Sequence, residues 1–207
     1  MAVSIPNDGL AIVRAAFGPI GADRLVGART ADVTIRDVAA TLVYRLDAVE
    51  HARRCAIGLR AVTRIDWLDC LLHMPVGQPM HPDALTAGEC QIIRQLPRGC
   101  VRASGVQLIR EIVRPVAVDA ALIVRSDWRA GMFDAGSFSS YCTRIVAVAG
   151  IPDKQAEVEA DYYGIGLIIN AAVSPEVVVP PQRFSAAVHS AAGWSFAERT
   201  YREVTAC

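Results

Sequence analysis

The spacing of apolar residues changes at Pro115, and this change limits the possible folds more than any other feature of the sequence. Residues 116–124 read Val-Ala-Val-Asp-Ala-Ala-Leu-Ile-Val, a nearly continuous apolar run that is typical of a strand buried on both faces. Similar runs follow at 144–149 and 164–169, and a short one at 177–179 precedes two prolines. The sequence therefore predicts about four strands after Pro115.

The connections between these runs predict how the strands pair. Residues 153–160 leave room for a two-turn helix between the second and third strands, which predicts a parallel crossover. The last two strands are close enough to form a hairpin. Residues 125–142 are rich in Gly, Ser and Asp and predict a long loop, a type of segment that often carries function.

The chain before Pro115 carries signals that are typical of helices. After Thr34, apolar residues recur every three or four positions, which predicts a long helix that ends near Gly58. The same spacing predicts a short helix over 65–72, and capping boxes predict further helices that begin at Thr86 and Ser104.

Together these patterns predict an α/β or α+β protein with a helical N-terminal half and a small mixed sheet in the C-terminal half. The expected regions are 1–114, mostly helical, and 115–207, a mixed sheet with flanking helices, in one or two domains. A capping box at Ser195 predicts a last helix. Because 53% of the residues are apolar and 20% are charged, the chain has ample material for a core and is not expected to be disordered.

Basic residues are concentrated over 53–64 and 94–114, although the 21 basic and 21 acidic residues of the whole chain balance in charge. All the basic residues except Lys154 are arginines, and a guanidinium can hold phosphate through two parallel hydrogen bonds. We therefore expect a non-enzymatic protein that binds nucleic acid or phosphate, either alone or as a subunit of a larger assembly. The alternative is that these arginines only form solvent-exposed helix faces. The predicted binding residues are Arg53, Arg54, Arg60, Arg64, Arg94, Arg98 and Arg102.

Two other classes of function stay open. The first is a small-molecule enzyme with its site in the 125–142 loop, for which Asp119, Asp127 and Cys142 are the candidate catalytic residues. The second is a structural or interaction protein that uses its apolar content at an interface with a protein partner or with a second copy.

Two short patterns resemble known families. Residues 33–39, Val-Thr-Ile-Arg-Asp-Val-Ala, resemble the opening of the helix-turn-helix of LacI-type repressors, which implies a DNA-reading helix. The resemblance ends there, because 41–46 continue without the expected glycine turn. The predicted strand order resembles the restriction-endonuclease-like fold, whose catalytic pattern places Glu-x-Lys on the strand after an Asp such as Asp119. The chain contains no Glu-x-Lys, so we expect either no relationship or a relative that does not cleave.

Cysteines and histidines are the remaining candidates for chemistry. Cys70, His73, His81 and Cys90 have ligand-forming side chains, but their spacing matches no specific zinc pattern, and we predict no metal and no cofactor. The sequence shows no secretory signal and no apolar run of membrane-spanning length, so we expect no membrane contact and a cytoplasmic protein with reduced thiols.

Overall fold

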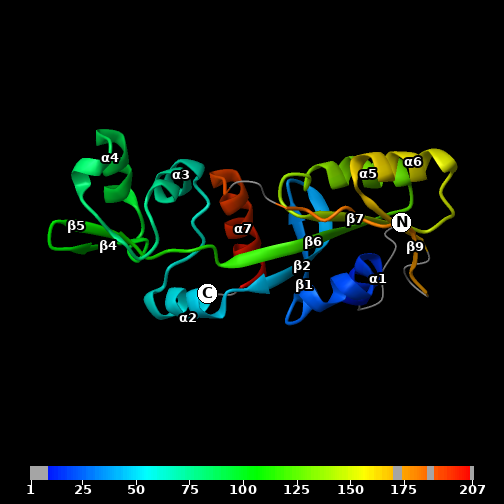
Figure 1. Cartoon of the computed structure of the whole chain (residues 1–207), viewed down its shortest axis with the longest axis horizontal. Helices are drawn as coiled ribbons and strands as arrows, with labels where there is room; N and C mark the ends of the chain where they lie inside the picture. Colours follow the sequence, from blue (N-terminus) through cyan, green and yellow to red (C-terminus); the bar gives the residue numbers. More distant parts are fainter. Residues whose placement is uncertain (1–8, 170–173, 186–188, 206–207) are drawn as a thin grey trace. The chain divides into compact units, whose positions relative to one another are not determined.

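The computed structural model describes residues 9–169, 174–185 and 189–205, and the chain divides into two compact units (Figure 1). Unit 1 combines Met1–Arg45 with Val118–Ala186, and unit 2 combines Leu46–Ala117 with Ala187–Cys207. The chain thus leaves unit 1, builds most of unit 2, returns to unit 1 and ends in unit 2.

Unit 1 is built on a six-stranded mixed sheet whose strands follow one another in chain order. The central strands β6, β7 and β8 are parallel, and antiparallel hairpins β1–β2 and β8–β9 lie at the two edges. The strands are β1 (Arg29–Ile35), β2 (Val38–Leu46), β6 (Val116–Arg125), β7 (Thr143–Val148), β8 (Gly166–Ile169) and β9 (Glu176–Val179).

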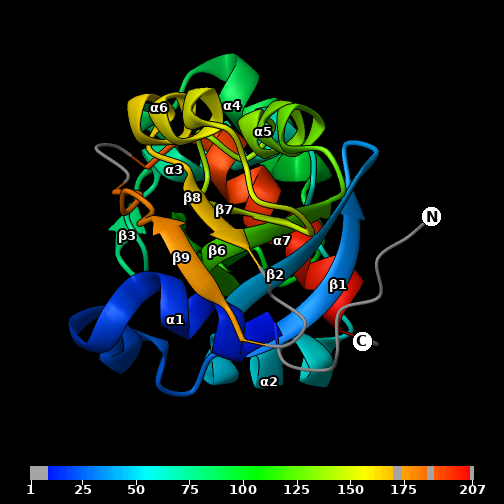
Figure 2. The ribbon, with the colours of Figure 1, turned by 90° about the vertical axis from the view of Figure 1, so that its right-hand side faces the viewer.

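Helices cover both faces of this sheet. Helices α5 (Trp128–Gly136) and α6 (Lys154–Tyr163) lie on one face, and α1 (Gly9–Ala22) lies on the other (Figure 2). A short 3-10 helix, η1 (Asp23–Leu25), follows α1. Fully buried side chains of α1 and of the three parallel strands form the core of the unit, among them Val13, Leu122, Ile145 and Ile168.

Unit 2 combines helices with a small antiparallel sheet of strand order β3-β5-β4. Its core includes Leu68, Leu71, Cys100, Ile112 and Trp194, all fully buried. The elements are α2 (Ala48–Ile57), α3 (Ile65–His73), β3 (Pro79–Met80), the 3-10 helix η2 (Pro82–Ala84), α4 (Ala87–Gln95), β4 (Val101–Ser104), β5 (Gln107–Arg110) and α7 (Ala191–Val204).

The predicted long helix after Thr34 is wrong, because residues 29–46 form the β1–β2 hairpin. Ile35 and Val38 pair across a two-residue turn, and both are buried. A spacing of three residues therefore fits two buried positions of a hairpin as well as it fits one face of a helix. β-branched residues dominate this segment and favour strands. The segment that resembles a LacI-type helix-turn-helix is this hairpin, so it presents no DNA-reading helix. Helix α2 does end at Gly58, whose φ of 68° provides the left-handed cap.

Two other predicted helix starts are also wrong. Ser104 ends β4, and it pairs with Gln107 across a turn that contains Gly105 at φ 60°. Ser195 lies inside α7, which is capped instead by Ser190 through a bond from the Gly193 N–H. In both places a serine followed three residues later by Gln or Glu satisfied the local pattern. At Ser104 strand pairing replaced the helix, and at Ser195 the helix is present but begins earlier, at its cap Ser190.

The expected helical N-terminal half is therefore wrong: the protein is α+β, with helices spread along the described chain and a sheet larger than the four strands predicted. The strands after Pro115, the helix over 65–72, the capping box at Thr86, the parallel crossover through α6 and the last hairpin are confirmed. The expected loop over 125–142 contains helix α5. Within the described ranges, no helix combines the length and apolar character needed to cross a bilayer.

Candidate anion-binding site

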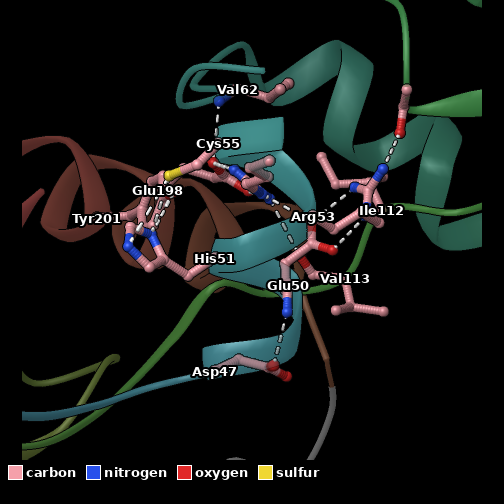
Figure 3. Close-up of polar contacts among 12 residues, drawn as sticks. Asp47, Glu50, His51, Arg53, Cys55, Val62, Ile112, Val113, Glu198 and Tyr201 are labelled. Atoms are coloured by element: carbon pink, nitrogen blue, oxygen red, sulfur yellow. Dashed lines mark hydrogen bonds and ion pairs between the residues drawn. The ribbon is translucent and has the colours of Figure 1, made fainter. Parts of the chain in front are cut away.

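Arg54, which the sequence suggested as a phosphate ligand, is fully buried inside unit 2. Figure 3 labels its carboxylate partners, Glu50 of α2 and Glu198 of α7. Its Nε donates to Glu50 Oε1 at 2.7 Å, and its Nη1 and Nη2 each donate to a carboxylate oxygen of Glu198 at 2.7 Å. Nη2 also donates to the Val113 carbonyl at 3.0 Å. Arg54 is therefore not available to a ligand, and its role is to hold α2 to α7.

The carboxylates around Arg54 are also well satisfied. Glu198 accepts bonds from the Val62 N–H at 2.9 Å and from Trp194 Nε1 at 3.0 Å. The guanidinium lies 5.1 Å from the centre of the Tyr201 ring. Burial by itself would lower the pKa of Arg54, but the hydrogen bonds and negative charges of its two carboxylate partners outweigh burial and raise it. Arg54 and its two carboxylate partners therefore stay charged although they are buried, because each charge is paired.

A pocket of about 710 Å³ in unit 2 brings together arginines that are distant in sequence. It is lined by Arg53 of α2, Arg98 before β4, Arg102 of β4 and Arg110 of β5. We call this site the arginine pocket. Three of its four arginines belong to the set that the sequence suggested for phosphate binding.

Two of these arginines have carboxylate partners. Arg53 donates to both oxygens of Glu50, at 2.7 and 2.8 Å, and to the Gly99 carbonyl at 2.9 Å. The hydrogen bonds that Arg53 donates to the Glu50 carboxylate raise the pKa of Arg53. Arg102 donates to Glu111 at 2.7 Å, and the side chains of this pair are 54% and 32% exposed, so solvent screens it. Both guanidiniums are held in place while keeping donors for a ligand.

The other two arginines bring charge that no carboxylate neutralises. Within the described ranges, neither Arg98 nor Arg110 forms an ion pair, and Arg98 is exposed. Arg110 is buried beneath the pocket, with its guanidinium 4.5 Å from the centre of the Trp194 ring, and burial lowers its pKa. Its Nε and Nη1 donate only to backbone carbonyls, those of Ile112, Leu71 and Met74. The arginine pocket thus carries net positive charge and suits an anion.

The remaining predicted arginines do not line this pocket. Arg64 pairs with Asp66 at 2.5 Å and lies 4.5 Å from the centre of the Trp67 ring. Arg60 and Arg94 are exposed. The seven arginines therefore do not act as one group: Arg54 is internal, three line the pocket and three lie elsewhere in unit 2.

The candidate catalytic aspartates of unit 1 have structural partners. Asp119 of β6 accepts two hydrogen bonds from Arg45 of β2, at 2.9 and 2.6 Å. Asp127 caps α5 by accepting from the Ala130 N–H at 3.0 Å. Strand β7, Thr143–Val148, contains no acidic residue that could join Asp119 in holding a metal ion.

Cys142, the third candidate for catalysis, is unsuited to act as a nucleophile. Its side chain is buried at the start of β7, and burial raises the pKa of its thiol to about 12. Since the thiolate is the reactive form, this raised pKa disfavours nucleophilic attack by Cys142, and its burial is typical of a core residue. Of the three candidate catalytic residues, Asp119 and Asp127 thus have structural partners and Cys142 is buried.

The cysteines and histidines of unit 2 do not gather into a metal site: the described part of the chain has no group of three or more potential ligands. His73 binds Glu89 at 2.7 Å and His81 lies 3.3 Å from Asp83. The expectation of reduced thiols throughout is wrong at Cys55, which is disulfide-bonded. Cys70, Cys90, Cys100 and Cys142 are free, and Cys207 lies outside the described residues.

An apolar surface, as the interaction hypothesis requires, is most prominent on the helices that cover one face of the unit 1 sheet. Phe133 of α5 is 83% exposed, and Val158 and Tyr162 of α6 are 60% and 80% exposed. Large exposed apolar side chains on neighbouring helices are typical of a surface that contacts another molecule.

Comparison of the chain with protein-family models, with curated proteins and with solved structures gives no match. The evidence for function is therefore the geometry of the site. Arg110 belongs to the arginine-rich segment 94–114 that the sequence associates with phosphate, but it is not among the seven predicted binding residues, because the Ser104 pattern predicts a helix where the structure has the β4–β5 hairpin. Its position as the last residue of β5 is what aligns it beneath the pocket.

Proposed function

We propose that unit 2 binds nucleic acid and holds a backbone phosphate in the arginine pocket. The observation that carries this proposal is the convergence of Arg53, Arg98, Arg102 and Arg110 from separate segments on one pocket, with no carboxylate partner for two of them among the described residues. Planar guanidiniums match phosphate oxygens through paired hydrogen bonds, and the two pre-positioned arginines lose little side-chain entropy on binding.

The surroundings of the pocket favour an extended ligand over a single free phosphate. Exposed polar side chains continue from Arg98 to Gln95, Arg94 and Gln91 of α4. None of these four carries negative charge, so a chain of phosphates could follow them without repulsion. Gln91, Arg94 and Gln95 supply positive charge and hydrogen-bond donors over about one turn of α4, and Arg98 follows the end of the helix.

The chemistry of the pocket favours duplex over single-stranded nucleic acid. Proteins that bind single strands stack bases on exposed aromatic rings. Among the described residues that line the pocket, none is aromatic. We therefore expect contacts to the duplex backbone, which carry affinity but little sequence preference.

The test is fluorescence anisotropy with a labelled DNA duplex across a salt series. Binding should weaken as salt rises from about 50 to 200 mM, because each neutralised phosphate releases condensed counterions. Arg98→Ala should weaken binding and reduce the slope of log K against log salt by about 0.9, the value for one phosphate contact. Arg98→Lys should recover less than full affinity, since an ammonium lacks the planar fork.

Arg199→Ala is the matched control, because Arg199 is an exposed arginine of unit 2 that lies outside the pocket. It removes the same charge and should leave the affinity and the salt slope nearly unchanged. The proposal fails if the protein does not bind duplex at low salt, or if the Arg98 and Arg199 variants weaken binding equally. A clear preference for single strands would reject the duplex assignment.

A further inference from the structure

A second pocket in unit 2, of about 860 Å³, has a positive and an apolar side. Arg110 and Arg114 line it together with His189 and Ser190 at the start of α7. Arg110 also lines the arginine pocket, but Arg114 does not. The volume lies within the range of sites that hold small organic molecules, about 300–1,000 Å³.

The two arginines of this pocket carry positive charges that no carboxylate neutralises. Within the described ranges neither forms an ion pair, and the lining carboxylate Asp69 pairs with neither of them. Arg114 is half-buried, and its side chain donates only a long bond, 3.4 Å from Nη2 to the Ser190 carbonyl. Burial lowers the pKa of both guanidiniums, and the charge of Arg114 lowers that of Arg110 further. Two neighbouring cations removed from water are stabilised when an anion lies between them.

The remaining lining residues define the rest of the ligand. The apolar lining residues of the pocket include Leu72, Met74, Pro75 and Val76, together with Trp194, which is fully buried. His73 also lines the pocket, but its Nδ1 is bound to Glu89 at 2.7 Å. The pocket therefore offers an apolar wall beside the paired guanidiniums.

We propose that the second pocket binds a small organic anion, with its carboxylate or phosphate head held by Arg110 and Arg114 and its apolar body against Leu72 and Met74. This site shares Arg110 with the arginine pocket but has Arg114 and the apolar side chains Leu72 and Met74 to itself, so the proposal holds whether or not unit 2 binds nucleic acid. A carboxylate and a phosphate monoester share the recognition chemistry, so the experiment compares both head groups.

The test is a titration followed by thermal melting and by calorimetry, with benzoate and phenyl phosphate as probes and benzyl alcohol and benzylamine as matched controls. At least one anion should raise the melting temperature, and neither the neutral nor the cationic probe should do so. Which anion binds more tightly identifies the head group. Stabilisation by all four probes, or by none, would overturn the proposal.

Arg114→Gln tests the assigned head-group site. It should raise the dissociation constant of the preferred anion at least tenfold while leaving the melting temperature of the free protein unchanged or higher, because it removes a cation that repels Arg110. A purely structural role for Arg114 predicts the opposite, a lower melting temperature with normal ligand affinity, and that result would reject the proposal. Arg98→Gln, which alters only the arginine pocket, should bind the anion normally.

Leu72→Trp provides a second variant that changes no charge. Leu72 is half-buried at the pocket, and a larger side chain there should fill the space for the apolar body and abolish the response to the anion. A folded Leu72→Trp protein that binds the anion as tightly as the unaltered protein would place the ligand elsewhere and refute the assignment. Because neither variant changes Arg98 or Arg102, loss of anion binding is distinguishable from loss of nucleic-acid binding.

Discussion

Replacement of Arg54 by Met should be the most damaging single change in unit 2. Arg54 has no exposed surface, and the side chains of its partners Glu50 and Glu198 are 2% and 0% exposed. Arg54→Met keeps an unbranched side chain out to the position of Nε but removes four hydrogen bonds and the positive charge shared by two carboxylates.

The expected loss in free energy of unfolding follows from the partners that the two carboxylates keep in Arg54→Met. Glu50 retains Arg53, but Glu198 retains only neutral donors, the Val62 N–H and Trp194 Nε1. Removal of one partner of a buried ion pair costs about 3–5 kcal/mol, because the other charge stays buried without compensation. Since the whole free energy of unfolding of a typical domain is about 5–15 kcal/mol, this variant should be close to unfolding.

Urea denaturation followed by tryptophan fluorescence measures this loss, and a double-mutant cycle isolates its cause. Glu198→Gln in the Arg54→Met background should recover part of the stability, because it removes the uncompensated carboxylate. Arg64→Met is the control: it breaks the exposed pair with Asp66 and should change stability little. Effects of Arg54→Met and Glu198→Gln that simply add, or a loss no larger than that of the control, would refute this account of the network.

Three further changes test local features. Asp37→Gly should raise the free energy of unfolding in urea by about 0.5–1 kcal/mol, because Asp37 has φ 64° in the two-residue hairpin turn and glycine is favoured there; unchanged or lower stability would contradict the strain. Gly131→Ala should lower it by about 1–3 kcal/mol, since its Cβ would lie 2.6 Å from Val146 Cγ1, and a stable variant would contradict the packing of α5 on β7. The Thr86 N–H and then His73 hold the pKa of Glu89 at about 2, and Glu89 raises that of His73 above 6.5. The stabilisation by this pair is therefore complete between the ordinary pKa values of 4.5 and 6.5 and is lost as the pH rises through the raised pKa of His73. The stability difference between the unaltered protein and His73→Ala should therefore shrink as the pH rises beyond 6.5; a difference that grows with pH would contradict the pairing.

The sequence predicted strands and helices correctly where a local pattern of residues was enough to specify them. The apolar run at 116–124 is strand β6, and the capping box at Thr86 begins α4, because both depend on residues close in the chain. It failed at Thr34 and Ser104, where residues that fit a helix start also fit a hairpin. Pairing with another strand decides between these alternatives, and such pairing depends on residues far along the chain.

The candidate site divides in the same way. Abundant arginine in 53–64 and 94–114 is visible in the sequence and already favours a polyanion as ligand. Yet adjacent residues Arg53 and Arg54 have opposite roles, since a helix turns successive side chains about 100° apart and directs one to the pocket and the other into the core.

The amino-acid sequence by itself determined the amount of apolar material, the presence of strands after Pro115 and the supply of guanidinium groups. Only the tertiary structure decided which arginines meet carboxylates and which do not. That difference rests on contacts between residues such as Arg54 and Glu198, which are distant in the chain, and no local pattern records which charges will be neutralised when the chain folds.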